Sequence, residues 1–186
     1  VSYNLTTDYS NADNPNGPWS YIYSGNPLAH QSAPTANGNL LIPAIPAGGY
    51  FSTGPDLNSN TPDVLKAAVN GSSAGLTDTD FLAGDILIHS PNDGTALSIV
   101  WTAPSAGTIS NFFAAVWYAH SSVNRSNDVN LDVTGTPPDD IGPISNSFGF
   151  NRNAPNSVTS SPFTVNAGDL ITLSFLKTAG QSFGSL

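Results

Sequence analysis

The side chains of this sequence that could do chemistry are three histidines and a set of aspartates. The histidines are His30, His89 and His120. His89 ends a predicted strand and His120 closely follows another, so we expect both near the rim of one sheet. Two histidines and an aspartate there could hold zinc or copper, or form a general base. Their spacing matches no known ligand signature, and the competing interpretation is a structural or surface role.

Every acidic residue is an aspartate, which favours calcium over the other chemistries of carboxylates. Calcium prefers oxygen ligands from Asp, Asn and backbone carbonyls in loops. Glycoside hydrolysis would need two positioned carboxylates, and only aspartates could supply them. The sequence has no EF-hand or nonapeptide signature. The candidate calcium ligands lie near the first turn or in a later loop: Asp8, Asp13 and Asn14, or Asp78 and Asp80.

Aromatic side chains are the third group, and they suit sugar recognition because a ring face packs against the apolar face of a pyranose. Trp19, Tyr21 and Tyr23 alternate along a predicted strand and share one face. Trp117 and Tyr118 are adjacent, so they place one ring on each face of a sheet. Tyr50, beside Phe51, is a further candidate. The alternative is that these rings form the core, because aromatics dominate core burial.

Composition excludes several classes of partner. The 186 residues carry 4 basic and 13 acidic side chains, a formal net charge of −9. Such a chain repels nucleic acid and anionic lipid. It has no cysteine, which excludes thiolate catalysis, disulfides and cysteine-ligated metals. No apolar stretch approaches the roughly 20 residues that cross a bilayer, so we expect no membrane insertion.

The same composition predicts an all-β fold. Glu and Met are missing and Lys and Arg are scarce, and these are good helix formers. Thr, Val, Ile and aromatics fit strands, and 17 Gly and 15 Pro interrupt the chain every few residues. We predict one antiparallel, jelly-roll-like β-sandwich domain over residues 1–186, with about ten short strands. Residues 25–63 are its loop-rich part.

The pattern also predicts individual elements. A single short helix is expected over residues 62–69, with Thr61 as N-cap and Pro62 at its first position. A three-strand meander is expected over residues 84–117, with a hairpin turn at residues 90–94. The other predicted strands are Tyr3–Asp8, Trp19–Ser24, Leu40–Ile45, Tyr50–Ser52, Val129–Val133, Ser145–Phe150, Phe163–Val165 and Leu170–Leu176.

Three motifs carry a resemblance to a known family. They are Asp8-Tyr-Ser with Asn14-Pro-Asn-Gly-Pro-Trp-Ser-Tyr21, His89-Ser-Pro with Val100-Trp-Thr-Ala-Pro-Ser-Ala-Gly107, and Asn166-Ala-Gly-Asp-Leu-Ile-Thr-Leu-Ser-Phe175. They resemble motifs of bacterial secreted proteins with a C-terminal Pro-Glu-Pro (PEP-CTERM-type) exosortase sorting signal. The resemblance implies a carbohydrate-binding-module-like sandwich in an exported, surface or matrix protein, and it implies no catalytic residues.

The chain departs from that family at its end. It stops at Gly180–Leu186, where the family continues into a last strand, the sorting signal and a basic anchor. A missing last strand would leave a sheet edge open, and an open edge can recruit a strand from another chain. The chain also starts at Val1, which is typical of a secreted protein after removal of its signal peptide, or of a trimmed segment.

Three functions follow from these observations. The first is a non-catalytic, secreted or cell-surface module that binds a polysaccharide or surface glycan, with calcium as the one candidate cofactor. The second is a structural subunit of an extracellular matrix or fibre that self-associates through an open sheet edge. The third is a small hydrolase or metal-dependent enzyme that uses His89, His120 and an aspartate.

Overall fold

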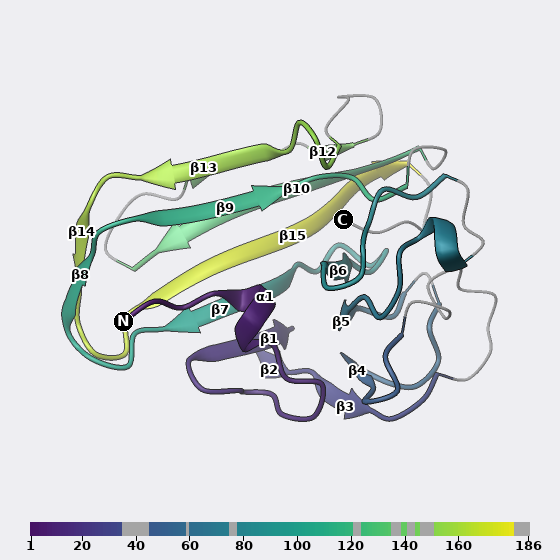
Figure 1. Ribbon diagram of the computed structural model, residues 1–186, viewed down its shortest axis with the longest axis horizontal. Coiled ribbons are helices and arrows are strands. Elements are labelled where there is room, and N and C mark those ends of the chain that lie inside the picture. Colours follow the sequence, from purple (N-terminus) through teal and green to yellow (C-terminus); the bar gives the residue numbers. More distant parts are fainter. Residues whose placement is uncertain are drawn as a thin grey trace.

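The computed structural model describes most of the chain. The described residues are 1–34, 45–58, 60–74, 78–120, 124–134, 139–140, 144–145 and 151–180. Helical turns among them are limited to α1 (Leu5–Asp8) and the 3-10 turn η2 (Ser72–Ala74). None of these helices has the length and apolar character that crossing a bilayer requires. The fold is an all-β antiparallel sandwich, as the composition predicted (Figure 1).

The larger sheet has seven strands and is organised around its longest strand. β15 (Leu170–Gly180) pairs on one side with β7 (Leu97–Thr102) and on the other with β10 (Arg125–Val133). β15 and β10 extend side by side along the molecule (Figure 1). The remaining strands flank these three: β1 (Trp19–Tyr23), β2 (Asn26–Pro27), β11 (Asp139–Asp140) and β12 (Ile144–Ser145).

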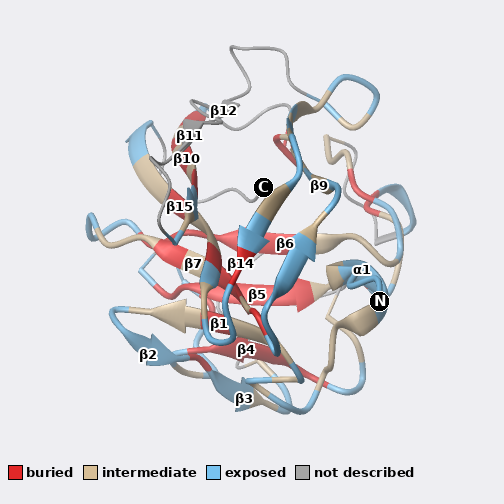
Figure 2. Ribbon diagram, turned by 90° about the vertical axis from the view of Figure 1, so that its left-hand side faces the viewer, coloured by how far each residue is buried: buried red, intermediate tan, exposed pale blue. Residues whose placement is uncertain are grey.

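The second sheet has four strands that pair in chain order. They are β3 (Ala29–Gln31), β4 (Tyr50–Ser52), β5 (Asp63–Lys66) and β6 (Ile86–His89). They succeed one another from the bottom of the view to its middle in Figure 1. β4 and β5 are buried along almost their whole length, which Figure 2 shows in red.

A bent two-stranded ribbon completes the fold. β8 (Gly107–Ile109) pairs with β14 (Phe163–Val165), and β9 (Phe112–Val116) pairs with β13 (Asn156–Ser160). Both pairs keep the same register, so they are two parts of one hairpin-like ribbon. The interruption falls where Pro162 would lie opposite Ser110, and proline has no N–H to donate to a ladder.

The core lies between the inner faces of the two sheets. The larger sheet contributes alternate residues such as Tyr21, Ile99 and Val129, and the smaller sheet contributes Phe51 and Val64. A second cluster covers the outer face of the smaller sheet, where Tyr50, Leu65 and Leu87 pack under the loops before β5 and β6. The smaller sheet is therefore apolar on both faces.

Many predicted strands are confirmed. β1 occupies the predicted Trp19–Ser24 run, β4 coincides with Tyr50–Ser52, and β14 coincides with Phe163–Val165. β10 alternates buried and half-buried residues as its pattern predicted. β15 begins as predicted and continues to Gly180. Residues 40–44 of the predicted strand Leu40–Ile45 lie outside the described residues, and so do residues 146–150 of the predicted strand Ser145–Phe150.

Three predictions of local structure are wrong. Residues 63–66 form strand β5 and not a helix, because Val64 and Leu65 are buried on opposite faces of a sheet. The predicted strand Tyr3–Asp8 contains α1, because the Asn4 side chain accepts the Thr6 N–H and caps a helical turn.

The third correction concerns the meander over residues 84–117. β6 pairs with β5 in the smaller sheet, whereas β7 pairs with β1 and β15 in the larger one. The turn at residues 90–94 therefore carries the chain from one sheet to the other. Its Asp-Gly chemistry is present, with Gly94 at φ +81°, but it does not join neighbouring strands.

Asn14 fixes the first turn to the sheet. Its amide donates to the backbone carbonyls of Tyr21 and Leu28, both at 2.8 Å, and its Oδ1 accepts the Tyr21 N–H at 2.8 Å. The side chain thus uses its donors and its acceptor on the backbone of β1 and of the segment after β2. Asn14, a predicted calcium ligand, has its amide oxygen engaged in a structural bond.

We expect Asn14→Ala to lower the free energy of unfolding by about 3 kcal/mol, because it removes three hydrogen bonds and takes this partner from the Tyr21 N–H and the Leu28 carbonyl. Urea denaturation followed by tryptophan fluorescence measures this loss. The control is Asn26→Ala, which removes one bond from an exposed amide to the Ser24 carbonyl and should change stability by less than about 0.5 kcal/mol. Equal losses for the two variants would contradict the bridging role of Asn14.

Candidate functional site

A large cleft of about 890 Å³ opens between the N-terminal segment and the bent ribbon. Residues 1–6 and Trp19 line one part, and residues 104–117, which include β8 and β9, line another. Its deeper lining consists of apolar residues from both sheets, among them Ile88, Ile99 and Leu173. The volume falls within the range of about 300–1,000 Å³ that is typical of small-molecule sites.

The N-terminal wall is held by hydrogen bonds from three other segments. Lys66 Nζ donates to the Thr6 carbonyl at 2.6 Å, and Asn16 Nδ2 donates to the Asp8 carbonyl at 2.6 Å. Trp19 Nε1 donates to Asp8 Oδ2 at 3.3 Å. These bonds place α1 against the mouth of the cleft, which allows Tyr3 to meet Trp101 edge-on with ring centroids 5.4 Å apart.

Asp8, a predicted calcium ligand, uses its carboxylate for hydrogen bonds within the N-terminal wall of the cleft. Its carboxylate accepts the Asn4 N–H at 2.8 Å and the Thr7 hydroxyl at 3.1 Å, besides the Trp19 indole. The Asn4 backbone bond is the main reason why the pKa of Asp8 is lower than usual. The Asp8 carboxylate and the Asn4 side chain thus both accept backbone N–H groups at the N-terminal end of α1.

The ribbon wall carries the second set of aromatic rings. Phe113 on β9 is 60% exposed, which is unusual for a phenylalanine, and Phe112 is half-buried on the opposite face. Trp117 follows β9, and its Nε1 donates to the Asp80 carbonyl at 2.7 Å. Both walls of the cleft therefore present aromatic rings.

Trp117 is fixed from outside the cleft by Arg152. The guanidinium Cζ lies 5.2 Å from the centroid of the Trp117 ring, which is a cation–π distance. The guanidinium also forms an ion pair with the carboxylate of Asp85, and the Arg152 N–H donates to Asp80 Oδ2 at 2.7 Å. Arg152 does not line the cleft, whereas Trp117 and Asp85 do.

The structure separates the predicted aromatic site residues into three groups. Tyr21, Tyr50 and Tyr118 are at most 3% exposed, so their rings belong to the cores and offer no face to a ligand. Trp19 and Trp117 line the cleft. Tyr23 lies elsewhere on the surface, where its hydroxyl bonds to Asp93. Trp117 and Tyr118 both follow the end of β9, where Trp117 is half-buried and Tyr118 is buried.

The predicted metal ligands do not gather within the described residues. No group of three or more His, Asp, Glu or Cys side chains lies close enough there to hold a metal ion. Asp13 accepts a bond of 3.4 Å from Ser10, and Asp80 accepts the Arg152 N–H. Asp78 contributes a negative charge near His120. These contacts stabilise loops.

The histidines occupy three different environments. His30 Nε2 lies 2.9 Å from the Gly48 carbonyl on the exposed edge of the smaller sheet. His120 is buried after β9, and burial lowers its pKa. His89 Nδ1 lies 3.0 Å from the Thr61 carbonyl and 3.9 Å from Asp63 Oδ2 inside the protein. His89 and His120 are both about 3% exposed, which takes them off the expected sheet rim.

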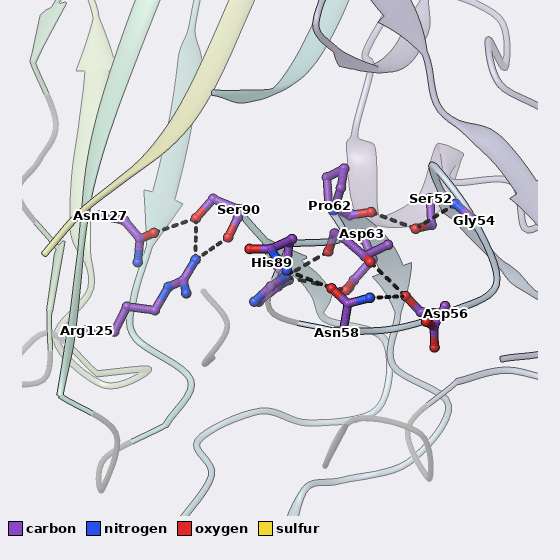
Figure 3. A network of polar contacts seen from close by, with 12 residues as sticks. Ser52, Gly54, Asp56, Asn58, Pro62, Asp63, His89, Ser90, Arg125 and Asn127 are labelled. Atoms are coloured by element: carbon purple, nitrogen blue, oxygen red, sulfur yellow. Dashed lines mark hydrogen bonds and ion pairs between the residues drawn. The ribbon is translucent and has the colours of Figure 1, made fainter. Parts of the chain in front are cut away.

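His89 is part of a buried polar cluster that the sequence analysis did not anticipate. Figure 3 shows this cluster between the sheets, with Arg125 and Asn127 of β10 reaching toward Ser90. Arg125 is fully buried and donates to the Ser90 carbonyl and, at 3.0 Å, to its hydroxyl. The Ser90 hydroxyl in turn donates to Asn127 Oδ1 at 2.6 Å.

Asp63 is the acidic member of this region. It is completely buried on β5, and neither of its carboxylate oxygens accepts a hydrogen bond from the described residues. Burial raises the pKa of Asp63 to about 8, and the positive charge of Arg125 opposes that rise. Burial also lowers the pKa of Arg125 to about 10, so the guanidinium is cationic at neutral pH.

The lining residues Tyr3, Asp85 and Phe113, and the supporting Arg152, were missed by the sequence analysis. For Phe113 a signal was present: Phe112 and Phe113 are adjacent in a strand, so one ring must face away from the core. For Arg152 no local signal exists, because its partners Asp80 and Asp85 lie about 70 residues earlier in the chain.

Comparisons of the chain with known protein families, with curated proteins and with solved structures found no match. The function is therefore argued from the site itself.

The raised pKa of Asp63 predicts a pH dependence of stability. Between about pH 4 and pH 8 the folded protein keeps a proton that the unfolded chain releases, so this group makes stability fall as pH rises. Below pH 4 both states are protonated, and above pH 8 the loss levels off. We expect Asp63→Asn to remove this contribution, which is at least about 1 kcal/mol between pH 5 and pH 8.

Urea unfolding of the wild type and of Asp63→Asn from pH 5 to pH 8 measures the difference between their free energies of unfolding. His120 has a lowered pKa and contributes with the opposite sign, but it contributes equally to both proteins and so drops out of the difference. Asp132→Asn removes an exposed carboxylate of β10 and should keep the wild-type curve. Parallel curves for wild type and Asp63→Asn would show that Asp63 does not titrate in this range.

Proposed function

We propose that the protein is a non-catalytic module that binds a polysaccharide or another glycan in the cleft between α1 and the bent ribbon. The observation that carries the proposal is the make-up of the cleft walls. Aromatic rings of Tyr3, Trp19, Phe113 and Trp117 line it together with small hydroxyl and amide side chains. Aromatic faces and a few directional polar groups are what a sugar-binding cleft needs.

The polar side chains of the walls can supply the hydrogen bonds of a sugar's hydroxyl groups. The ribbon contributes Ser105, Thr108, Ser110 and Asn111, and the N-terminal wall contributes Ser2 and Thr6. These side chains are short and neutral, so little rotamer entropy is lost when they are ordered by a ligand. The resemblance to exported sandwich proteins supports the same proposal, and with it a secreted or cell-surface location.

We expect the purified chain to be retained saturably on at least one member of a panel of soluble and insoluble polysaccharides. Trp117→Ala should then weaken binding at least about tenfold, because it removes an aromatic anchor. Pull-down followed by titration calorimetry measures both effects. Parallel runs with calcium and with chelator show whether the predicted calcium takes part.

Tyr23→Ala is the matched control, because it removes an aromatic side chain of β1 that does not line the cleft. It should bind like wild type. No retention on any glycan would overturn the proposed function, and equal losses for Trp117→Ala and Tyr23→Ala would overturn the proposed site.

A structural subunit is the second candidate, and the exposure of Phe113 favours it. β9 pairs with β13 on one side only among the described strands. An apolar edge of this kind can pair with a strand of another copy. Light scattering after size exclusion distinguishes the candidates: assembly predicts a mass that rises with concentration and falls in Phe113→Ser, whereas a mass of one chain throughout contradicts it.

A further inference from the structure

We infer that the cleft selects uncharged glycans, because the one acidic side chain among its described lining residues is neutralised by Arg152 outside the lining. This inference rests on the proposed function and names the ligand class of the same site. Among the described lining residues, Asp85 carries the one carboxylate, and none is Lys, Arg or His. The inference therefore depends on the state of Asp85.

The Asp85 carboxylate is engaged in interactions within the protein. Its Oδ2 pairs with the guanidinium of Arg152 and also accepts the Leu82 N–H at 2.8 Å. The side chain of Asp85 is only 12% exposed and that of Arg152 is 33% exposed. In such a half-buried pair the two charges cancel at short range, so a ligand in the cleft meets almost no net charge from it.

Each charged class of glycan meets an obstacle. An acidic glycan finds no cationic side chain in the described lining, and the net charge of −9 repels it at longer range. A cationic glycan would have to take Asp85 from Arg152, which would leave the guanidinium unpaired beside the Trp117 ring. Burying an unpaired charge in the cleft is costly in either case. An uncharged sugar chain needs only the rings and the neutral polar side chains.

Arg152 therefore has two effects on the site. It balances the charge of Asp85, and it contacts the Trp117 ring from outside the cleft lining. It is a positioning residue, since it does not line the cleft. Removing its charge while keeping a polar side chain, as in Arg152→Gln, leaves the Asp85 carboxylate without its cation next to the lining.

The test compares oligosaccharides of equal length and linkage that differ in charge. The probes are neutral β-1,4-linked glucose and N-acetylglucosamine oligomers, the deacetylated cationic oligomer and an oxidised, uronic-acid oligomer. Titration calorimetry at two salt concentrations measures their affinities. We expect a neutral oligomer to bind at least about tenfold more tightly than both charged ones in the wild type.

The variants test the role of Arg152. Arg152→Gln should weaken the neutral oligomer and strengthen the cationic one several-fold, an effect that disappears at high salt. The double variant Arg152→Gln with Asp85→Asn should restore the preference for the neutral oligomer. Thermal unfolding of each variant checks that changes in affinity do not arise from loss of folding. The comparison of neutral with charged oligomers in the wild type does not depend on the variants.

The outcomes separate the two proposals. If none of these oligomers binds and the wider polysaccharide panel also fails, both proposals are wrong. If a charged oligomer binds the wild type as tightly as a neutral one, the cleft is not selective for uncharged glycans, although the glycan-binding proposal stands. If Arg152→Gln keeps the wild-type preference, the balancing role of Arg152 is wrong.

Discussion

The structure depends on the pairing of β15 with β7 on one side and β10 on the other. β15 supplies Ile171 and Phe175 to the core, and it pairs with residues that lie 38–55 positions earlier in β10 and 68–78 positions earlier in β7. The N-terminal strand β1 pairs with β7. The chain crosses to the smaller sheet between β2 and β3 and returns to the larger sheet between β6 and β7. Without this central pairing the inner face of the larger sheet would not exist as one surface.

The cleft follows from how the two sheets are completed. The smaller sheet is covered on its outer face by loops, so its apolar residues are buried on both sides. The strand pairs of the bent ribbon are separate from both sheets, and the cleft is lined by the ribbon, the N-terminal segment and residues of both sheets. The molecule thus has apolar lining and aromatic residues in one place, and the one acidic side chain among the described lining residues, Asp85, is paired with Arg152.

Local patterns were sufficient where a strand has one buried and one exposed face. The alternation of Trp19, Tyr21 and Tyr23, and of Val129, Leu131 and Val133, correctly predicted β1 and β10 because burial follows a period of two. The pattern failed at Val64 and Leu65, since both are buried and the local cap signals of Thr61 and Pro62 favoured a helix. Here tertiary packing on two faces outweighed the local preference.

Sequence patterns were also silent on partners that are distant in the chain. The turn at residues 90–94 has the chemistry of a hairpin, yet nothing local shows that its two strands join different sheets. The same holds for Arg125 with Ser90, and for Arg152 with Asp85. Trp19 and Trp117 could be nominated as ligand-facing rings, but only the fold places them in one cleft.

The internal use of cations leaves the outer surface with a strongly one-sided charge. Of the four basic side chains, Arg125 is fully buried and Arg152 is paired with Asp85. Lys66 and Lys177 are the other two basic side chains of a sequence with 13 carboxylates, and Lys66 donates to the Thr6 carbonyl. Copies of the protein therefore repel one another at low ionic strength, and close packing on a matrix requires salt or a layer of bound counterions.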